Sequence, residues 1–277
     1  MRFGWSAKNT SMRLYWLAIL VCILITASYI FIYWFEPFSQ FWNSFFANFF
    51  LQVASLFAAL ITTLIWARYE KTDTPRQVWG PFAVSLWLWF AAEISWGYLN
   101  VTVGEVHVGL PDVFWVTAYF GLGLALLNQY RILLRPEKRA LRNAVWIVAL
   151  ALFAFTLLIY SVFVSATDTP SKLDAAVNSF YPAGDLLLAG VALWLAGHFA
   201  GGAFARPWMG LLVFTFSDLL YAWLEASGTY SWSVDHGNLL STISDVAYLV
   251  AYLVLFVCVL YQWLFLKYGM LSPVDGQ

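Results

Sequence analysis

Long apolar runs alternate with short polar connections along the whole chain. A helix needs about 20 consecutive apolar residues to cross a bilayer, and runs of that length recur throughout the sequence. They lie near residues 14–35, 44–67, 78–99, 112–134, 143–165, 176–199, 207–226 and 239–266. No connection is long enough for a separate domain. The pattern predicts an all-α integral membrane protein, in which about eight transmembrane helices form one polytopic domain over residues 1–277.

The composition supports this prediction and excludes nucleic-acid binding. Hydrophobic residues make up 62% of the chain and charged residues 10%, whereas about a quarter of the residues of a soluble domain are charged. The lipid bilayer is therefore the expected partner. The net charge of −1 offers no basic surface for a nucleic acid. The two cysteines lie inside apolar runs, so we expect buried thiols and no disulfide framework.

The basic residues fix an orientation for the predicted helices. With eight spans, every Lys and Arg except Lys172 falls on the side of the chain termini. These residues are Arg2, Lys8, Arg13, Arg68, Lys71, Arg76, Arg131, Arg135, Lys138, Arg139, Arg142, Arg206 and Lys267. Because cytoplasmic loops carry an excess of positive charge, both termini are predicted to be cytoplasmic, in a multi-pass protein of the cell (inner) membrane.

Acidic residues inside the apolar runs are the first candidates for function. Ionisable groups in a membrane are costly and usually functional. The acids concerned are Glu93, Asp112, Asp185, Asp218, Asp245 and, at a span end, Glu225. In the predicted orientation all of them fall in the outer half of the bilayer. We therefore predict one polar cavity that opens to the outside.

Aromatic residues follow these acids at helical spacing, three, four or seven positions apart, which places them on the same helix face. The sequence therefore predicts a ligand-binding site made of Glu93, Trp96, Asp112, Tyr119, Tyr181, Asp185, Asp218, Tyr221, Asp245, Tyr248 and Tyr252. Two structural alternatives remain open. The acids and tyrosines could simply hydrogen-bond across helices, and Asp112 and Asp245 could cap helix N-termini.

The same residues indicate an internal repeat. Asp112 to Tyr119 and Asp245 to Tyr252 share the spacing of an acid and two aromatic residues. The preceding helices carry Glu93-x-x-Trp96 and Asp218-x-x-Tyr221. Helices 3–4 and 7–8 of the prediction cross the membrane in the same direction. The pattern predicts a parallel repeat, an arrangement that commonly builds a site between two halves.

Other chemistry finds little support in the sequence. His107 and His236 lie in loops of the two halves, but neither has a second ligand at metal-binding spacing, so no metal site is predicted. His198 could bind a haem or chlorin metal, but an interfacial position near a helix C-terminus, which suits a cation, explains it better. A retinal Schiff base would need a lysine deep in the last helix, which has only Lys267 at its end. Catalytic sequence motifs are absent, so we expect no enzyme activity, and any cofactor is unknown.

The order of these motifs resembles a known type of membrane region. The motifs are Glu93-Ile-Ser-Trp96, Pro111-Asp112 to Tyr119, Tyr181-Pro-Ala-Gly-Asp185-Leu-Leu-Leu188, Asp218-Leu-Leu-Tyr221 and Asp245 to Tyr252. In this order they resemble the multi-helix N-terminal membrane region of bacterial GGDEF/EAL cyclic-di-GMP proteins and related histidine kinases. Such proteins continue into a catalytic output domain, which residues 1–277 do not contain. The resemblance therefore implies a sensory membrane module.

We accordingly predict a non-catalytic membrane sensor or receptor-like module that binds a small ligand in an outward-facing polar cavity. A cytoplasmic or membrane protein partner would contact the basic segment 131–142 or the C-terminus, although lipid contact explains that segment as well. Two alternatives remain. The chain could be a cofactor-binding or scaffold subunit of a larger membrane complex, or a proton-coupled transporter.

Overall fold

The described part of the protein is built from helices. The computed structural model describes residues 4–103, 108–133, 147–148, 150–152, 154–155, 158–159, 172–199, 202–230 and 239–269. The long helices are α1 (Gly4–Phe35), α2 (Gln40–Arg68), α3 (Arg76–Thr102), α4 (Leu110–Leu133), α6 (Lys172–His198), α7 (Arg206–Ala226) and α8 (Leu239–Tyr268). These 7 helices are long and apolar enough to cross a membrane, and no strand occurs in the described part. The predicted all-α multi-pass architecture is confirmed. The predicted span at 143–165 lies mostly outside the described residues, so an eighth span stays a prediction.

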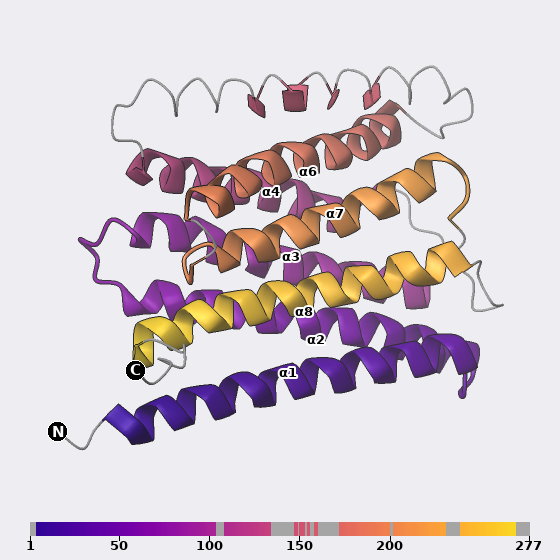
Figure 1. Ribbon diagram of the computed structural model, residues 1–277. Coiled ribbons are helices and arrows are strands. Elements are labelled where there is room, and N and C mark those ends of the chain that lie inside the picture. Colours follow the sequence, from indigo (N-terminus) through magenta and orange to yellow (C-terminus); the bar gives the residue numbers. More distant parts are fainter. Residues whose placement is uncertain are drawn as a thin grey trace.

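The helices run side by side along one axis (Figure 1). The start of α1 and the end of α8 lie at the same end of the bundle, which we call the terminal end. The opposite end is the distal end. Helices α4 and α6 both run from the distal to the terminal end, as an eight-span topology requires.

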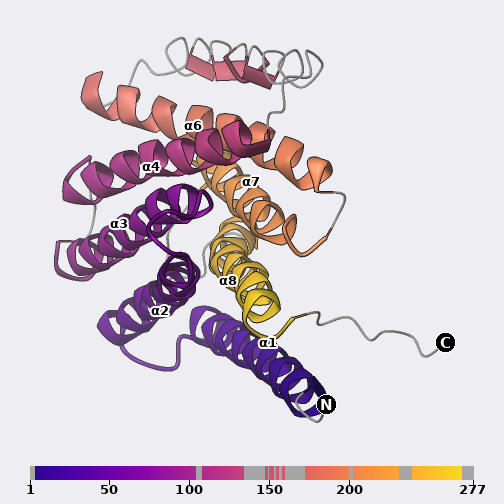
Figure 2. The same cartoon turned by 90° about the vertical axis from the view of Figure 1, so that its left-hand side faces the viewer.

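Helices α2, α3, α4, α6, α7 and α8 form a closed ring. Around it α2 packs against α3, α3 against α4, α4 against α6, α6 against α7, α7 against α8, and α8 against α2 again (Figure 2). Helix α1 lies outside the ring and packs against α8 and α2. The six helices of the ring therefore share one interior, although some of them are far apart in sequence.

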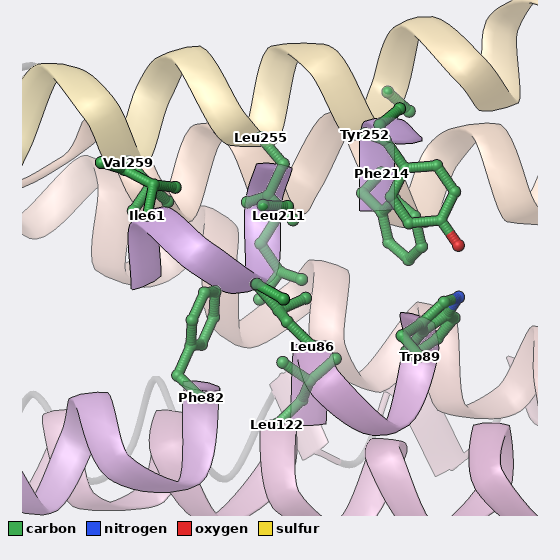
Figure 3. Packing of buried hydrophobic residues seen from close by; sticks show 14 of the residues in the cluster. Ile61, Phe82, Leu86, Trp89, Leu122, Leu211, Phe214, Tyr252, Leu255 and Val259 are labelled. Carbon is green, nitrogen blue, oxygen red and sulfur yellow. The ribbon is translucent and has the colours of Figure 1, made fainter. Parts of the chain in front are cut away.

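The terminal half of this interior is filled mainly by large apolar side chains. The Trp208 ring stacks on Trp79 with 6.4 Å between centroids and meets Phe82 edge-on at 6.0 Å. Further along the interior, Trp89 and Phe214 are in edge-on contact at 5.0 Å. Figure 3 shows Trp89, Phe214 and Tyr252 together at one edge of the apolar cluster, where the first polar atoms appear.

The outward faces of the helices are apolar as well. Trp16 on α1, Phe120 on α4 and Leu193 on α6 are 60%, 68% and 59% exposed. A continuous apolar surface of this kind is unfavourable in water and is expected where lipid chains cover the protein. The surface therefore supports contact with a lipid bilayer.

Close approach of α7 to α8 yields a first prediction. A Cβ atom at Gly210 would lie 3.0 Å from Leu255 Cα and 3.0 Å from Cys258 Cβ. Gly210→Leu should separate the two helices and destabilise the protein by about 1–3 kcal/mol, the usual range for overpacking. Thermal unfolding in detergent measures the effect. Gly123→Leu is the matched control, since a Cβ there meets nothing within 4 Å; equal melting temperatures for the two variants would contradict the packing described.

Candidate functional site

Glu93 joins α3 to α8 across the ring. The Tyr252 hydroxyl donates to Glu93 Oε1 at 2.5 Å and the Tyr248 hydroxyl donates to the same oxygen at 3.0 Å. The Trp89 indole nitrogen donates in turn to the Tyr248 oxygen at 3.3 Å. Glu93 is only 2% exposed. A carboxylate of the third helix is thus held by two phenols of the last helix.

Tyr119 of α4 holds two aspartates from two other helices. Its hydroxyl oxygen lies 2.7 Å from Asp185 Oδ1 on α6 and 2.8 Å from Asp218 Oδ2 on α7. A phenol carries one proton, so it can donate to only one of these carboxyls. The other short contact requires a proton on the carboxyl itself. The three groups therefore hold at least two protons, one on the phenol and one on a carboxyl, and together carry at most one negative charge.

Asp185 and Asp218 differ in their remaining oxygens. Asp185 is fully buried, and its Oδ2 has no hydrogen-bond partner among the described residues. Asp218, by contrast, is partly exposed. An unpartnered buried carboxylate oxygen is costly. This part of the site is therefore incomplete in the hydrogen bonds that the chain itself supplies.

Asp112 bonds both to a tyrosine and to the start of its own helix. The Tyr181 hydroxyl donates to Oδ1 at 2.6 Å, and the Gly109 backbone N–H donates to Oδ2 at 2.8 Å. An acid that reaches back to the backbone before a helix is the acidic half of a capping box. The structural alternative predicted for Asp112 therefore accounts for one of its two oxygens.

Asp245 is not a helix cap, and that alternative is wrong. Its two oxygens accept from Tyr33 of α1 at 2.6 Å and from Tyr230 at 3.0 Å. Tyr230 lies in the connection between α7 and α8. Burial first, and then the negative charge of Asp245, raise the pKa of Tyr230 far above its ordinary value, so this phenol remains a donor.

We call these five acids and the tyrosines that donate to them the carboxylate–tyrosine network. Its members are Glu93, Asp112, Asp185, Asp218, Asp245, Tyr33, Tyr119, Tyr181, Tyr230, Tyr248 and Tyr252. The network lies at two depths. Asp112 and Asp245 are near the distal helix ends, whereas Asp185 and Asp218 are close to the middle of α6 and α7. Asp185 lies at the midpoint of α6, and the placement of all the acids in the outer half of the bilayer stays a prediction.

The sequence identified most of these residues but not their pairing. Helical spacing suggested that each acid bonds a tyrosine of its own helix. Among the described residues no acid does so, and each tyrosine partner comes from another helix or from a connection. Trp96 contacts the Trp115 ring at 5.8 Å rather than an acid. Tyr221 packs edge-on against Tyr230 at 4.9 Å, and its hydroxyl makes no hydrogen bond to a described residue. Tyr33 and Tyr230 were missed, because neither stands at helical spacing from one of the acids inside the apolar runs.

Positive charge gathers at the opposite end of the bundle. The Arg76 guanidinium lies 4.3 Å from the Trp66 ring, Arg206 lies 3.4 Å from Tyr261, and Lys267 lies 4.5 Å from Trp263. All three cations are at the terminal end (Figure 1). No lysine or arginine of the described helices pairs with an acid of the network.

Of the three histidines considered as metal or haem ligands, one lies in the described part of the chain. No group of three His, Cys, Asp or Glu side chains in the described part of the chain could hold a metal ion. His198 stacks on Trp194 at 5.4 Å at the terminal end of α6. His107 and His236 lie outside the described residues.

Comparison with family models, with characterised proteins and with solved structures found no match to this chain.

The shared hydroxyl of Tyr119 gives the second prediction. Tyr119→Phe removes both contacts to Asp185 and Asp218 and leaves two buried carboxyls without a donor, which should destabilise the protein by about 1–3 kcal/mol. Denaturant unfolding in mixed micelles measures this. Tyr130→Phe on the same helix is the control, because the buried Tyr130 hydroxyl has no partner in the described structure. A loss of equal size in both variants would show that the Tyr119 contacts contribute nothing.

Proposed function

We propose that the chain is a non-catalytic membrane sensor or receptor-like module that binds a small ligand at the carboxylate–tyrosine network. In this proposal the protein lies in the cell (inner) membrane. Its distal end faces the outside, and both of its termini are cytoplasmic. The clustering of Arg76, Arg206 and Lys267 at the terminal end supports this orientation through the positive-inside rule. The observation that carries the function is a set of buried carboxylates with no basic partner among the described helices.

The network supports a sensing role because its bonds hold helices together across the ring. Glu93 bonds α3 to α8, and Tyr119 bonds α4 to both α6 and α7. A ligand that binds one of these carboxylates competes with the tyrosine bonded to it and weakens an interhelical contact. Helix α8 runs without a break from Asp245 to Lys267, so a shift at the network reaches the terminal end. A cytoplasmic or membrane protein partner would detect this helix shift at the C-terminus or at the basic segment 131–142. Most of that segment lies outside the described residues.

We further propose that the site lies between two halves related by a parallel repeat. The sequence pattern pairs Glu93 with Asp218 and Tyr119 with Tyr252. In the structure Tyr119 of the first half contacts Asp218 of the second, and Tyr252 of the second donates to Glu93 of the first. The helix neighbours correspond too, since α2 packs against α3 and α8 while α6 packs against α7 and α4. This reciprocal exchange supports the repeat.

A transporter receives less support from the same geometry. A proton relay needs polar groups through the full thickness of the membrane. Among the described helices the interior acids stop near the middle of the ring, and Trp79, Phe82 and Trp208 pack in the next layer. A binding site that is closed toward the terminal end suits a sensor better.

The proposed function predicts ligand binding that depends on the central aspartates. Purified protein would be screened by thermal shift against amino acids, sugars, organic acids, nucleosides and amines. A ligand of the wild type should lose most of its stabilising effect in Asp218→Asn and Asp185→Asn, and keep it in Glu225→Gln, an exposed acid on α7 outside the network. Ligand responses that are the same in all four proteins would rule the site out. A Soret, carotenoid or chlorin band in natively purified protein would favour the cofactor-binding subunit instead.

A further inference from the structure

The charge balance around Asp218 indicates what kind of ligand is missing. The contacts at the Tyr119 oxygen allow Asp185, Asp218 and Tyr119 together at most one negative charge, and they carry that charge when only one of the two carboxyls is protonated. No described lysine or arginine neutralises it. Burying an unpaired charge in a medium of low dielectric constant costs several kcal/mol. A positively charged group is the natural complement of this part of the network.

Unused hydrogen-bonding capacity points to the same place. Asp185 Oδ2 is buried without a partner, in a residue with 0% exposure. Asp218, whose Oδ2 lies 2.8 Å from the Tyr119 hydroxyl, is partly exposed. These acceptors suit a ligand that brings hydrogen-bond donors or a compact positive charge.

Tyr221 extends this region toward the distal end. It lies one helical turn from Asp218 on α7. Its hydroxyl has no partner among the described residues, and its ring is partly exposed. Tyr181, which is also partly exposed, is held in place by its bond to Asp112. Aromatic faces and carboxylates therefore occur together beside Asp218, the one aspartate of the network that is partly exposed.

We propose that Asp218, backed by Asp185 and Tyr119 and flanked by the rings of Tyr181 and Tyr221, binds the ammonium group of a small organic cation that enters from the distal end. The proposal rests on the proposed function and names the ligand class of the same site. Carboxylates provide charge for such a ligand, and aromatic faces attract quaternary and primary ammonium groups. A metal ion fits less well, because no three metal-binding side chains come together in the described part.

The test compares choline with 3,3-dimethylbutan-1-ol, a neutral molecule of the same shape, on the full chain in maltoside micelles, which carry no ammonium group. Tetramethylammonium and n-butylammonium are further cationic probes, and sodium chloride matches the ionic strength. Tryptophan fluorescence and thermal melting report binding. At least one ammonium probe should bind saturably and raise the melting temperature, whereas the neutral analogue and sodium should not.

Two variants locate the site. Asp218→Asn should raise the Kd of the bound ammonium probe at least tenfold, while Glu225→Gln should leave it within twofold. Tyr221→Ala should raise the Kd about tenfold and Tyr221→Phe less than threefold, since an attraction to the ring survives in phenylalanine. The Tyr221 variants remove no hydrogen bond between described residues, so they keep the test decisive if Asp218→Asn fails to fold.

Each contrary result has a distinct meaning. The proposal is overturned if the neutral analogue or sodium reproduces the ammonium effect, or if Asp218→Asn and Tyr221→Ala bind the probe like wild type. If no ammonium probe binds but another solute binds through Asp218, the ligand class is wrong and the proposed function stands. If neither the probes nor the solute screen yields a ligand, the proposed function fails with it.

Discussion

Buried carboxylates without basic partners are the constraint on which this structure depends. A carboxylate in a low-dielectric interior must be hydrogen-bonded, paired or protonated, because its desolvation is otherwise too costly. In the described part of the chain, tyrosine hydroxyls do this, supported by one backbone amide at Asp112. Tyrosine suits the role because its ring packs among apolar side chains while its hydroxyl reaches the acid. Arginine or lysine would bring a second charge that also needs solvation.

This solution shapes the bundle. Each bond of the network except that from Tyr230 to Asp245 joins two different helices, so the distal and middle levels of the bundle are fixed by specific polar contacts. The terminal level is different, because Trp79, Phe82 and Trp208 fill it by apolar packing. Cations at the terminal end lie over aromatic rings and not beside the acids. The bundle therefore has one end built for polar chemistry and another built for packing and for the membrane boundary.

Hydropathy was sufficient to predict the helices, since bilayer thickness sets their length whatever their neighbours are. The same argument found the acids, because a carboxylate inside an apolar run needs a reason to be there. Spacing along one helix could not find their partners. It shows which residues share a face, but not which other helix that face meets, and so it paired Asp218 with Tyr221 where the structure pairs it with Tyr119. Tyr33 and Tyr230 could not be found at all, because their relation to Asp245 exists only after the chain has folded.

The central claim is that Asp185 and Asp218 share one proton through Tyr119 and keep one negative charge for a ligand. Infrared spectroscopy of the purified protein at neutral pH tests it most directly, since protonated and ionised carboxyl groups absorb at different frequencies. The account predicts a protonated-carboxyl C=O band in wild type and in Glu225→Gln that is lost or reduced in Asp185→Asn. Identical spectra in this region for wild type and Asp185→Asn would contradict it.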